Sequence, residues 1–122
     1  MREQDIATDE TSRLISSSKV HGSAVYNREG ERLGTIQSVM IDKRSGQVEY
    51  AVLSFGGLFG LGAEHHPLPW QVLTYDPARR GYVAHVSKEA LGKAPSYSDE
   101  AEAIYDPEFE RALYGHYGLP LP

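Results

Sequence analysis

The sequence predicts an all-β domain, a small antiparallel β-barrel with short helical segments at its C-terminal end. Three observations predict this fold class. Short β-prone runs follow one another between Ala24 and Val86 at close, even spacing. Turns rich in Gly, Pro, Asn and Asp separate these runs. Almost no helical pattern lies between them, which favours a barrel or sandwich over an α/β fold.

Composition and charge argue against some classes of function before any motif is considered. The chain has 122 residues, the size of one domain, and a net charge of −5. Its 12 Lys and Arg residues are scattered, whereas nucleic-acid binding usually needs a basic stripe that faces the phosphates, so direct nucleic-acid binding is not expected. Cysteine is absent, and no apolar run approaches the ~20 residues that span a bilayer. We therefore expect a cytoplasmic protein without membrane insertion.

The domain limits follow from changes in composition along the chain. Residues 1–12 are mostly polar and include one Ile, and they are predicted to form a flexible tail because they bury too little surface to offset their ordering. Packing is expected to begin near Leu14 and Ile15. The barrel domain is predicted over residues 13–97, and residues 98–122 are predicted to form a helical extension too short to stand alone.

The first two strands are predicted over residues 24–26 and 33–42. Residues 27–30 between them form a turn that ends on a glycine able to take a positive φ. The apolar residues of the second strand do not alternate cleanly, since Ile36 falls on the opposite phase from Leu33, Val39 and Ile41. A β-bulge near residues 37–38 reconciles the two phases, and bulges of this kind bend the strands of small barrels.

The third strand is predicted over residues 47–55, after a hairpin turn at residues 42–46 that carries Asp first and Gly last. The first half of this strand alternates, and its second half is apolar on both faces, as expected of a strand covered on both sides. Residues 64–70 contain Pro67 and Pro69, which cannot donate ladder hydrogen bonds, so this segment is predicted to be an edge strand.

A last hairpin is predicted from residues 72–75 and 82–86, joined by a turn that contains Asp, Pro and Gly. Helix signals appear only after it. Ser87 is the predicted N-cap of a short helix, because its hydroxyl can accept a hydrogen bond from the first turn, and Gly92 is the predicted end of that helix.

A second helix is predicted to begin where Asp106 precedes Pro107, an N-cap residue followed by proline at the first helical position. Phe109, Leu113 and Tyr117 then fall on one apolar stripe. The sequence leaves open whether this segment packs on its own barrel or on a neighbouring molecule.

Several of these segments, in this order, resemble the PRC-barrel domain family. The resemblance is carried by VYNREG at residues 25–30, LGTI at 33–36, IDKRSGQVEYAVLSFGG at 41–57, PLPW at 67–70 and YD at 75–76. It covers roughly residues 13–97. It implies an antiparallel barrel similar in fold to the cytoplasmic barrel of the photosynthetic reaction centre H subunit and to the C-terminal barrel of a bacterial ribosome maturation factor.

The resemblance also implies binding rather than catalysis. The family has no established catalytic residues, and its barrels are used in assemblies with protein or ribonucleoprotein partners. This chain lacks the membrane helix of the H subunit and the N-terminal domain of the maturation factor, so neither specific function carries over. We predict a protein-binding module, not an enzyme, with no catalytic or cofactor-binding residues. An accessory role in ribosome or RNA processing, through a ribosomal protein, is a second hypothesis by analogy.

Three bulky residues in a glycine-rich loop are the candidate interface. Leu58, Phe59 and Leu61 lie within residues 56–62, and loops normally run over the surface. They either cap their own barrel or meet a second subunit, and because two-fold homodimers are the commonest oligomers, a homodimer through this loop is the first hypothesis. The loop does not predict a dinucleotide site, since prolines rather than a helix follow it.

A metal site is the third hypothesis, for a small metal-binding protein or a metal-dependent enzyme. Glu64 and His66 alternate on one face of a strand, and His85 from the neighbouring hairpin would be a third ligand. The spacing matches no established metal motif, so no metal residue is assigned. Trp70, the only tryptophan, is predicted to be a structural anchor where the proline-rich strand turns.

The loop hypothesis predicts that Phe59→Asp converts a dimer into a monomer, because a carboxylate cannot be buried against a second copy without a partner. Light scattering on the purified wild-type protein and the variant measures the two masses. A monomeric wild-type protein whose mass the substitution leaves unchanged contradicts a dimer through this loop.

Overall fold

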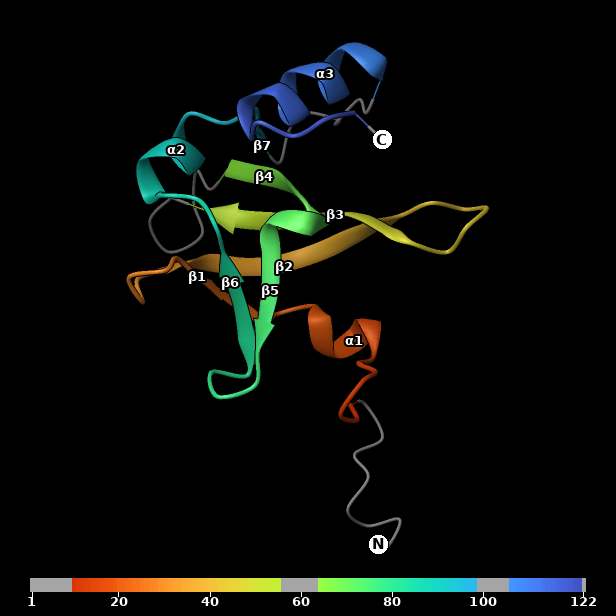
Figure 1. Ribbon diagram of the computed structural model, residues 1–122, viewed down its shortest axis with the longest axis vertical. Helices are drawn as coiled ribbons and strands as arrows, with labels where there is room; N and C mark the ends of the chain where they lie inside the picture. Colours follow the sequence, from red (N-terminus) through yellow and green to blue (C-terminus); the bar gives the residue numbers. More distant parts are fainter. Residues whose placement is uncertain (1–9, 56–63, 99–105, 122) are drawn as a thin grey trace, which may run out of the picture.

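The computed structural model describes residues 10–55, 64–98 and 106–121, which are mostly β (Figure 1). Within these residues seven strands form one curled sheet, a half-barrel, in the order β5-β6-β1-β2-β3-β4-β7. The strands are β1 (Ala24–Tyr26), β2 (Arg32–Ile41), β3 (Val48–Phe55), β4 (Glu64–Pro69), β5 (Leu73–Asp76), β6 (Gly81–Ala84) and β7 (Tyr97–Ser98). The prediction of a β-rich barrel fold with helical segments near the C-terminus is confirmed.

One strand pair departs from the predicted antiparallel arrangement. β1 pairs with β2 in antiparallel fashion but with β6 in parallel, so the sheet is mixed. The reason is the connection after β4, where the chain leaves the sheet through a 3-10 helix, η2 (Trp70–Val72), and the β5–β6 hairpin returns on the far side of β1. Among the described strands β5 and β7 each have one neighbour, so the sheet stays open between them.

The bulge predicted in the second strand is confirmed. The pairing of β2 with β3 shifts its register between Ile36 and Ser38. Close to this shift, Gly34 lies so near β3 that a side-chain carbon on it would overlap the backbone carbonyl oxygen of Ser54. Glycine at this position therefore allows the two strands to approach each other closely.

The hairpin turn between β2 and β3 forms as predicted. The Oδ1 atom of Asp42 accepts hydrogen bonds from the backbone N–H groups of Arg44 and Ser45, both at 2.8 Å. The N–H of Ser45, followed by that of Arg44, lowers the pKa of the Asp42 carboxyl because both donors stabilise its charged form. Gly46 closes the turn at a φ of +78°, a conformation that favours glycine.

The proline-containing strand has the predicted edge character over most of its length. β4 pairs with β3 from Glu64 to Pro69, but β7 covers its other side only at Glu64 and His65. Pro67 and Pro69 lie beyond that short pairing, where no described strand needs a hydrogen bond from their nitrogen atoms.

Three α-helices are described: α1 (Ser17–Val20), α2 (Lys88–Gly92) and α3 (Pro107–His116). Both predicted caps are confirmed. The hydroxyl of Ser87 accepts the N–H of Ala90 at 3.0 Å, and the carboxylate of Asp106 accepts the N–H of Phe109 at 2.8 Å. No helix among the described residues is long and apolar enough to cross a membrane.

The first helix was not predicted from the sequence. α1 is one turn long and starts after Ser16, whose hydroxyl accepts the N–H of Ser18 at 3.2 Å. Ser16, the first of three consecutive serines, is therefore the N-cap of this helix. The helix matters for packing because it places Val20, only 6% exposed, against the core.

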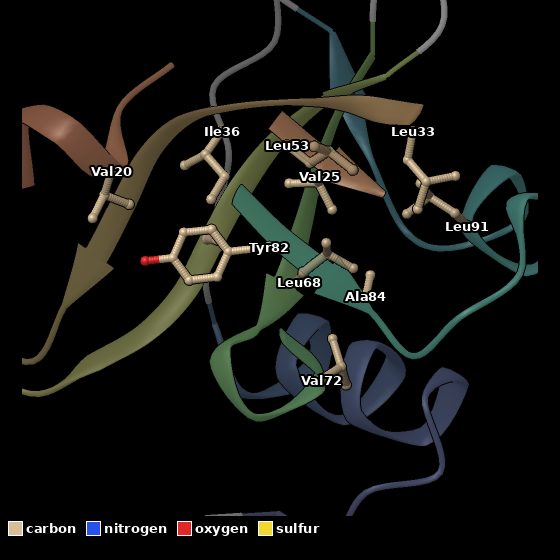
Figure 2. Close-up of a cluster of buried hydrophobic side chains, with 11 residues drawn as sticks. Val20, Val25, Leu33, Ile36, Leu53, Leu68, Val72, Tyr82, Ala84 and Leu91 are labelled. Carbon is tan, nitrogen blue, oxygen red and sulfur yellow. The ribbon is translucent and has the colours of Figure 1, made fainter. Parts of the chain in front are cut away.

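The core lies on the concave side of the sheet and joins strands that are distant in sequence. Figure 2 shows its side chains converging from α1, the strands, η2 and α2. The buried residues of this cluster are Val20, Val25, Leu33, Ile36, Ala51, Leu53, Leu68, Val72, Tyr82, Ala84 and Leu91. β3 is buried on both faces over its middle, from Tyr50 to Leu53, whereas Ser54 and Phe55 are partly buried, so the two-sided burial that the sequence predicts for the second half lies closer to the centre of the strand.

The C-terminal helix packs on its own sheet. Leu113 is fully buried, and Tyr114 is buried against Tyr50 of β3 with ring centroids 6.1 Å apart. The hydroxyl of Tyr50 donates a hydrogen bond to Glu110 of α3 at 2.8 Å. These contacts answer the question that the sequence leaves open, because α3 has a defined place on β3 within the same molecule.

The close approach of β2 and β3 predicts opposite effects for two Gly→Ala substitutions. Gly34→Ala is expected to destabilise the fold by about 1–3 kcal/mol, because the added methyl group forces the strands apart. Gly115→Ala is the matched control: it lies in α3 with no atom within 4 Å of the added carbon, so a gain of about 0.5–1 kcal/mol is expected. Urea unfolding measures both, and equal midpoints for the two variants contradict the packing of Gly34.

Candidate functional site

A groove opens where the sheet ends at β5. It has a volume of about 570 Å³ and lies between the β5–β6 hairpin and the segment before α1. We name it the seam groove. Its lining residues are Glu10, Thr11, Ser12, Arg13, Leu14, Ile15, Trp70, Leu73, Tyr75, Pro77 and Tyr82.

The floor of the seam groove is aromatic. Strand alternation places Leu73 and Tyr75 on one face of β5, and Tyr75 is paired across the strands with Tyr82 of β6. The rings of Tyr75 and Tyr82 lie 5.2 Å apart, and the ring of Trp70 lies 5.5 Å from that of Tyr82. Burial raises the pKa of Tyr82, so this phenol stays neutral near pH 7.

The opposite wall is the segment formed by residues 10–15. This segment forms a turn. Glu10 and Ile15 form a β-bridge, and the N–H of Thr11 donates a hydrogen bond of 2.7 Å to the carbonyl of Leu14. Ile15 packs against the core, whereas Leu14 is 56% exposed at the rim. Glu10, which the sequence assigns to a flexible tail of residues 1–12, is therefore in contact with the folded domain; residues 1–9 of that tail lie outside the described residues.

Glu10 ties this wall to the floor. The hydroxyl of Tyr75 donates a hydrogen bond of 2.7 Å to one carboxylate oxygen, and the ammonium group of Lys19 lies 2.8 Å from the other. The hydrogen bond from Lys19, and then that from Tyr75, lowers the pKa of Glu10. The same bond to Glu10 raises the pKa of Tyr75, because it stabilises the protonated phenol.

The comparison with known families agrees with this architecture. A family model described as PRC-barrel domain matches residues 13–91, well over half of the chain. The chain belongs to the PRC-barrel family. The match confirms the resemblance noted in the sequence, and it includes all strands of the sheet except β7. A search of curated proteins returned no match.

The predicted interface loop of this PRC-barrel protein is not part of the described structure. Leu58, Phe59 and Leu61 lie within residues 56–63, outside the described residues. The homodimer that the sequence places at this loop therefore stays a prediction.

The position of Trp70 goes beyond the structural anchor that the sequence predicts. It begins η2 at the corner after β4, packs against the core and remains partly exposed. Besides the seam groove, it borders a second hollow of about 380 Å³ between the sheet and the C-terminal segment. One aromatic ring thus contributes to two neighbouring concave surfaces.

The PRC-barrel domain does not bring the three hypothetical metal ligands together. Glu64 accepts a hydrogen bond of 2.9 Å from the hydroxyl of Ser96. His66 is buried with its ring 5.2 Å from that of Phe55, and burial lowers its pKa. Among the described residues no three His, Asp or Glu side chains form a group suited to a metal ion.

The third of these residues, His85, has both ring nitrogens engaged. The Nε–H group of Arg28 donates to Nδ1 of His85 at 2.9 Å, so the ring proton lies on Nε2. Nε2 in turn lies 2.9 Å from the hydroxyl of Thr74 and donates to it. Neither nitrogen has a lone pair left for a metal while these bonds hold.

Sequence reasoning did not identify the seam groove. It assigned Glu10 to a tail and treated Tyr75 and Tyr82 as ordinary hairpin residues. A signal was present, because residues 73 and 75 alternate on one strand opposite an aromatic residue on the next, close to the only tryptophan. What the sequence did not reveal is that the barrel stays open at this strand.

The contacts of Glu10 with Tyr75 and Lys19, together called the Glu10 tie, predict that the fluorescence of Trp70 changes with pH. This fluorescence reports hydration of the groove. Because the pKa of Glu10 lies below its usual value of 4.5, the tie is intact above that value and is lost as the pH falls through the lowered pKa. Wild-type emission is expected to shift to longer wavelength on acidification. Glu10→Gln is expected to show the shifted emission already at neutral pH, since an amide forms no ion pair with Lys19.

Glu108→Gln is the matched control for this titration, because Glu108 is exposed in the first turn of α3 and does not line the groove. The control is expected to keep the wild-type acid transition. An acid transition that persists unchanged in Glu10→Gln contradicts the role assigned to this carboxylate.

Proposed function

We propose that this PRC-barrel protein is a non-catalytic protein-binding module whose seam groove holds an uncharged, proline-containing segment of its partner. The observation that carries the proposal is the aromatic floor made by Trp70, Tyr75 and Tyr82. Grooves lined by such rings bind proline-rich segments in the polyproline II conformation, because the flat pyrrolidine rings pack on aromatic faces and the segment is already extended.

The size of the groove supports a short peptide. A volume of about 570 Å³ lies within the range of sites that enclose a few side chains or a small molecule. Pro77 and Leu73 add apolar surface next to the rings, and Ile15 adds it from the opposite wall. An apolar segment can therefore contact both walls at once.

The charges around the groove favour an uncharged occupant. The carboxylate of Glu10 is already compensated by Lys19 and by the hydroxyl of Tyr75. A cationic partner would have to displace Lys19, and an anionic partner would lie next to Glu10. A segment of Leu and Pro residues faces neither cost.

The titration behaviour of the floor supports binding rather than acid–base chemistry. The phenols of Tyr75 and Tyr82 have raised pKa values, the first through its bond to Glu10 and the second through burial. Neutral phenols at pH 7 act as hydrogen-bond donors and packing surfaces. The hydroxyl of Tyr75 already donates to Glu10, so this phenol offers an extended peptide a packing surface rather than a free hydrogen-bond donor.

The proposal is tested with a synthetic Leu-Pro-Leu-Pro peptide, blocked at both ends and titrated against the protein with Trp70 fluorescence as the readout. Wild type is expected to show a saturable change. Leu14→Glu places a charge at the rim and is expected to weaken binding at least about tenfold, or about 1.4 kcal/mol. Its matched control is Ile41→Glu, a residue of similar exposure (50%) on β2 that does not line the groove.

The control variant is expected to bind as wild type does. A Leu-Ala-Leu-Ala peptide, which lacks the polyproline II preference, is expected to bind more weakly. Absence of saturable binding to wild type, or an equal loss in Leu14→Glu and Ile41→Glu, rules out the seam groove as a peptide site.

A further inference from the structure

We infer that the partner segment is supplied by a second copy of this chain, whose Pro120 and Leu121, at the end of the segment formed by residues 118–121, enter the seam groove. The inference rests on the proposed function and names its partner. It gives a homodimer whose contact differs from the one that the sequence places at residues 56–62. The argument uses the chemistry of the segment, its position beside Trp70 and the rigidity of its base.

The chemistry of the end of the segment matches the groove. Pro120 and Leu121 carry no charge, whereas Leu119 before them packs against the core of its own chain. Leu121 is 52% exposed, one of four large apolar side chains on the surface of the described structure. Leu14, another of the four, lies at the rim of the seam groove. An apolar side chain on the segment and one at the groove are thus both left uncovered in the single chain.

The segment and the groove share Trp70 as a neighbour. Pro120 and Leu121 line the second hollow, and Trp70 borders both this hollow and the seam groove. A two-fold axis that passes beside Trp70 therefore brings the segment of each copy toward the groove of the other. Such a contact is reciprocal and closed, so it produces a dimer rather than a filament.

The base of the segment is held in place, which lowers the entropic cost of docking. α3 is anchored by fully buried Leu113 and by the hydrogen bond from Tyr50 to Glu110. Beyond α3, Gly118 takes a φ of +68°, and the N–H of Leu119 donates to the carbonyl of Tyr114 at 2.9 Å. The segment therefore leaves the helix in a fixed direction, and only its last residues have to be ordered on binding.

The test is complementation between two variants, followed by sedimentation velocity over a range of protein concentrations. Leu121→Ser impairs the segment but leaves the groove intact, whereas Leu14→Glu impairs the groove but leaves the segment intact. Wild type is expected to dimerise, and each variant alone is expected to dimerise at least about tenfold more weakly. An equimolar mixture is expected to dimerise more strongly than either variant but more weakly than wild type, because the intact segment of Leu14→Glu enters the intact groove of Leu121→Ser while the second of the two reciprocal contacts carries both substitutions.

Controls separate this contact from other modes of association. Ile41→Glu is expected to dimerise as wild type does, since Ile41 is exposed but belongs to neither surface. A wild-type protein that stays monomeric overturns the inference. So do variants that dimerise normally, or a mixture that stays as weak as its components.

The outcome also distinguishes this inference from the proposed function. Leu121→Ser retains its groove and is titrated with the blocked Leu-Pro-Leu-Pro peptide through Trp70 fluorescence. If the peptide binds saturably and the wild-type protein is monomeric, the groove holds a peptide of another protein. In that case the proposed function stands, and only the inference that the partner is a second copy is wrong. Loss of both peptide binding and dimerisation removes the inference and the proposed function together.

Discussion

The open seam of the half-barrel is the constraint on which the rest of the structure depends. A closed barrel pairs every strand edge, but here β5 and β7 each have one neighbour among the described strands. Side chains that face the core beside the seam, such as Tyr75 and Tyr82, therefore need cover from outside the sheet. Residues 10–15 supply it, and Glu10 fixes them in place. The seam groove is the space that this cover leaves.

The corner after β4 determines where that space lies. Pro67 and Pro69 lie beyond the short pairing of β4 with β7, and the chain then turns through η2 before β5 begins. The corner places Trp70 against Tyr82 while part of its ring remains exposed. A regular strand at this point would continue the sheet and remove both concave surfaces that Trp70 borders.

Local signals in the sequence predicted much of the fold. The bulge after Ile36 follows from a change of phase within one strand, and the caps at Ser87 and Asp106 follow from the preference of these residues for helix starts. Each of these features depends on residues within a few positions of one another. The sequence alone therefore contains the information needed to identify them.

The features that sequence reasoning missed depend on contacts between distant segments. The parallel pairing of β1 with β6 joins Val25 to Tyr82, and no local pattern marks it. The tie from Glu10 to Tyr75 spans an even longer separation, so a polar segment that looked like a tail forms one wall of the site. His85 was a plausible ligand by residue type, but its hydrogen bonds to Arg28 and Thr74 depend on the folded sheet.

The limits of the family match explain why the PRC-barrel fold alone does not specify a partner. The aromatic floor lies within the matched residues 13–91, so it belongs to the part of the chain that resembles other family members. Glu10, which closes one end of the groove, lies before that match, and α3 with residues 118–121 lies after it. The matched part of this chain thus contains the aromatic floor at the open seam. The flanking segments determine how that surface is covered, and it is in these segments that we expect the binding specificity of this protein to lie.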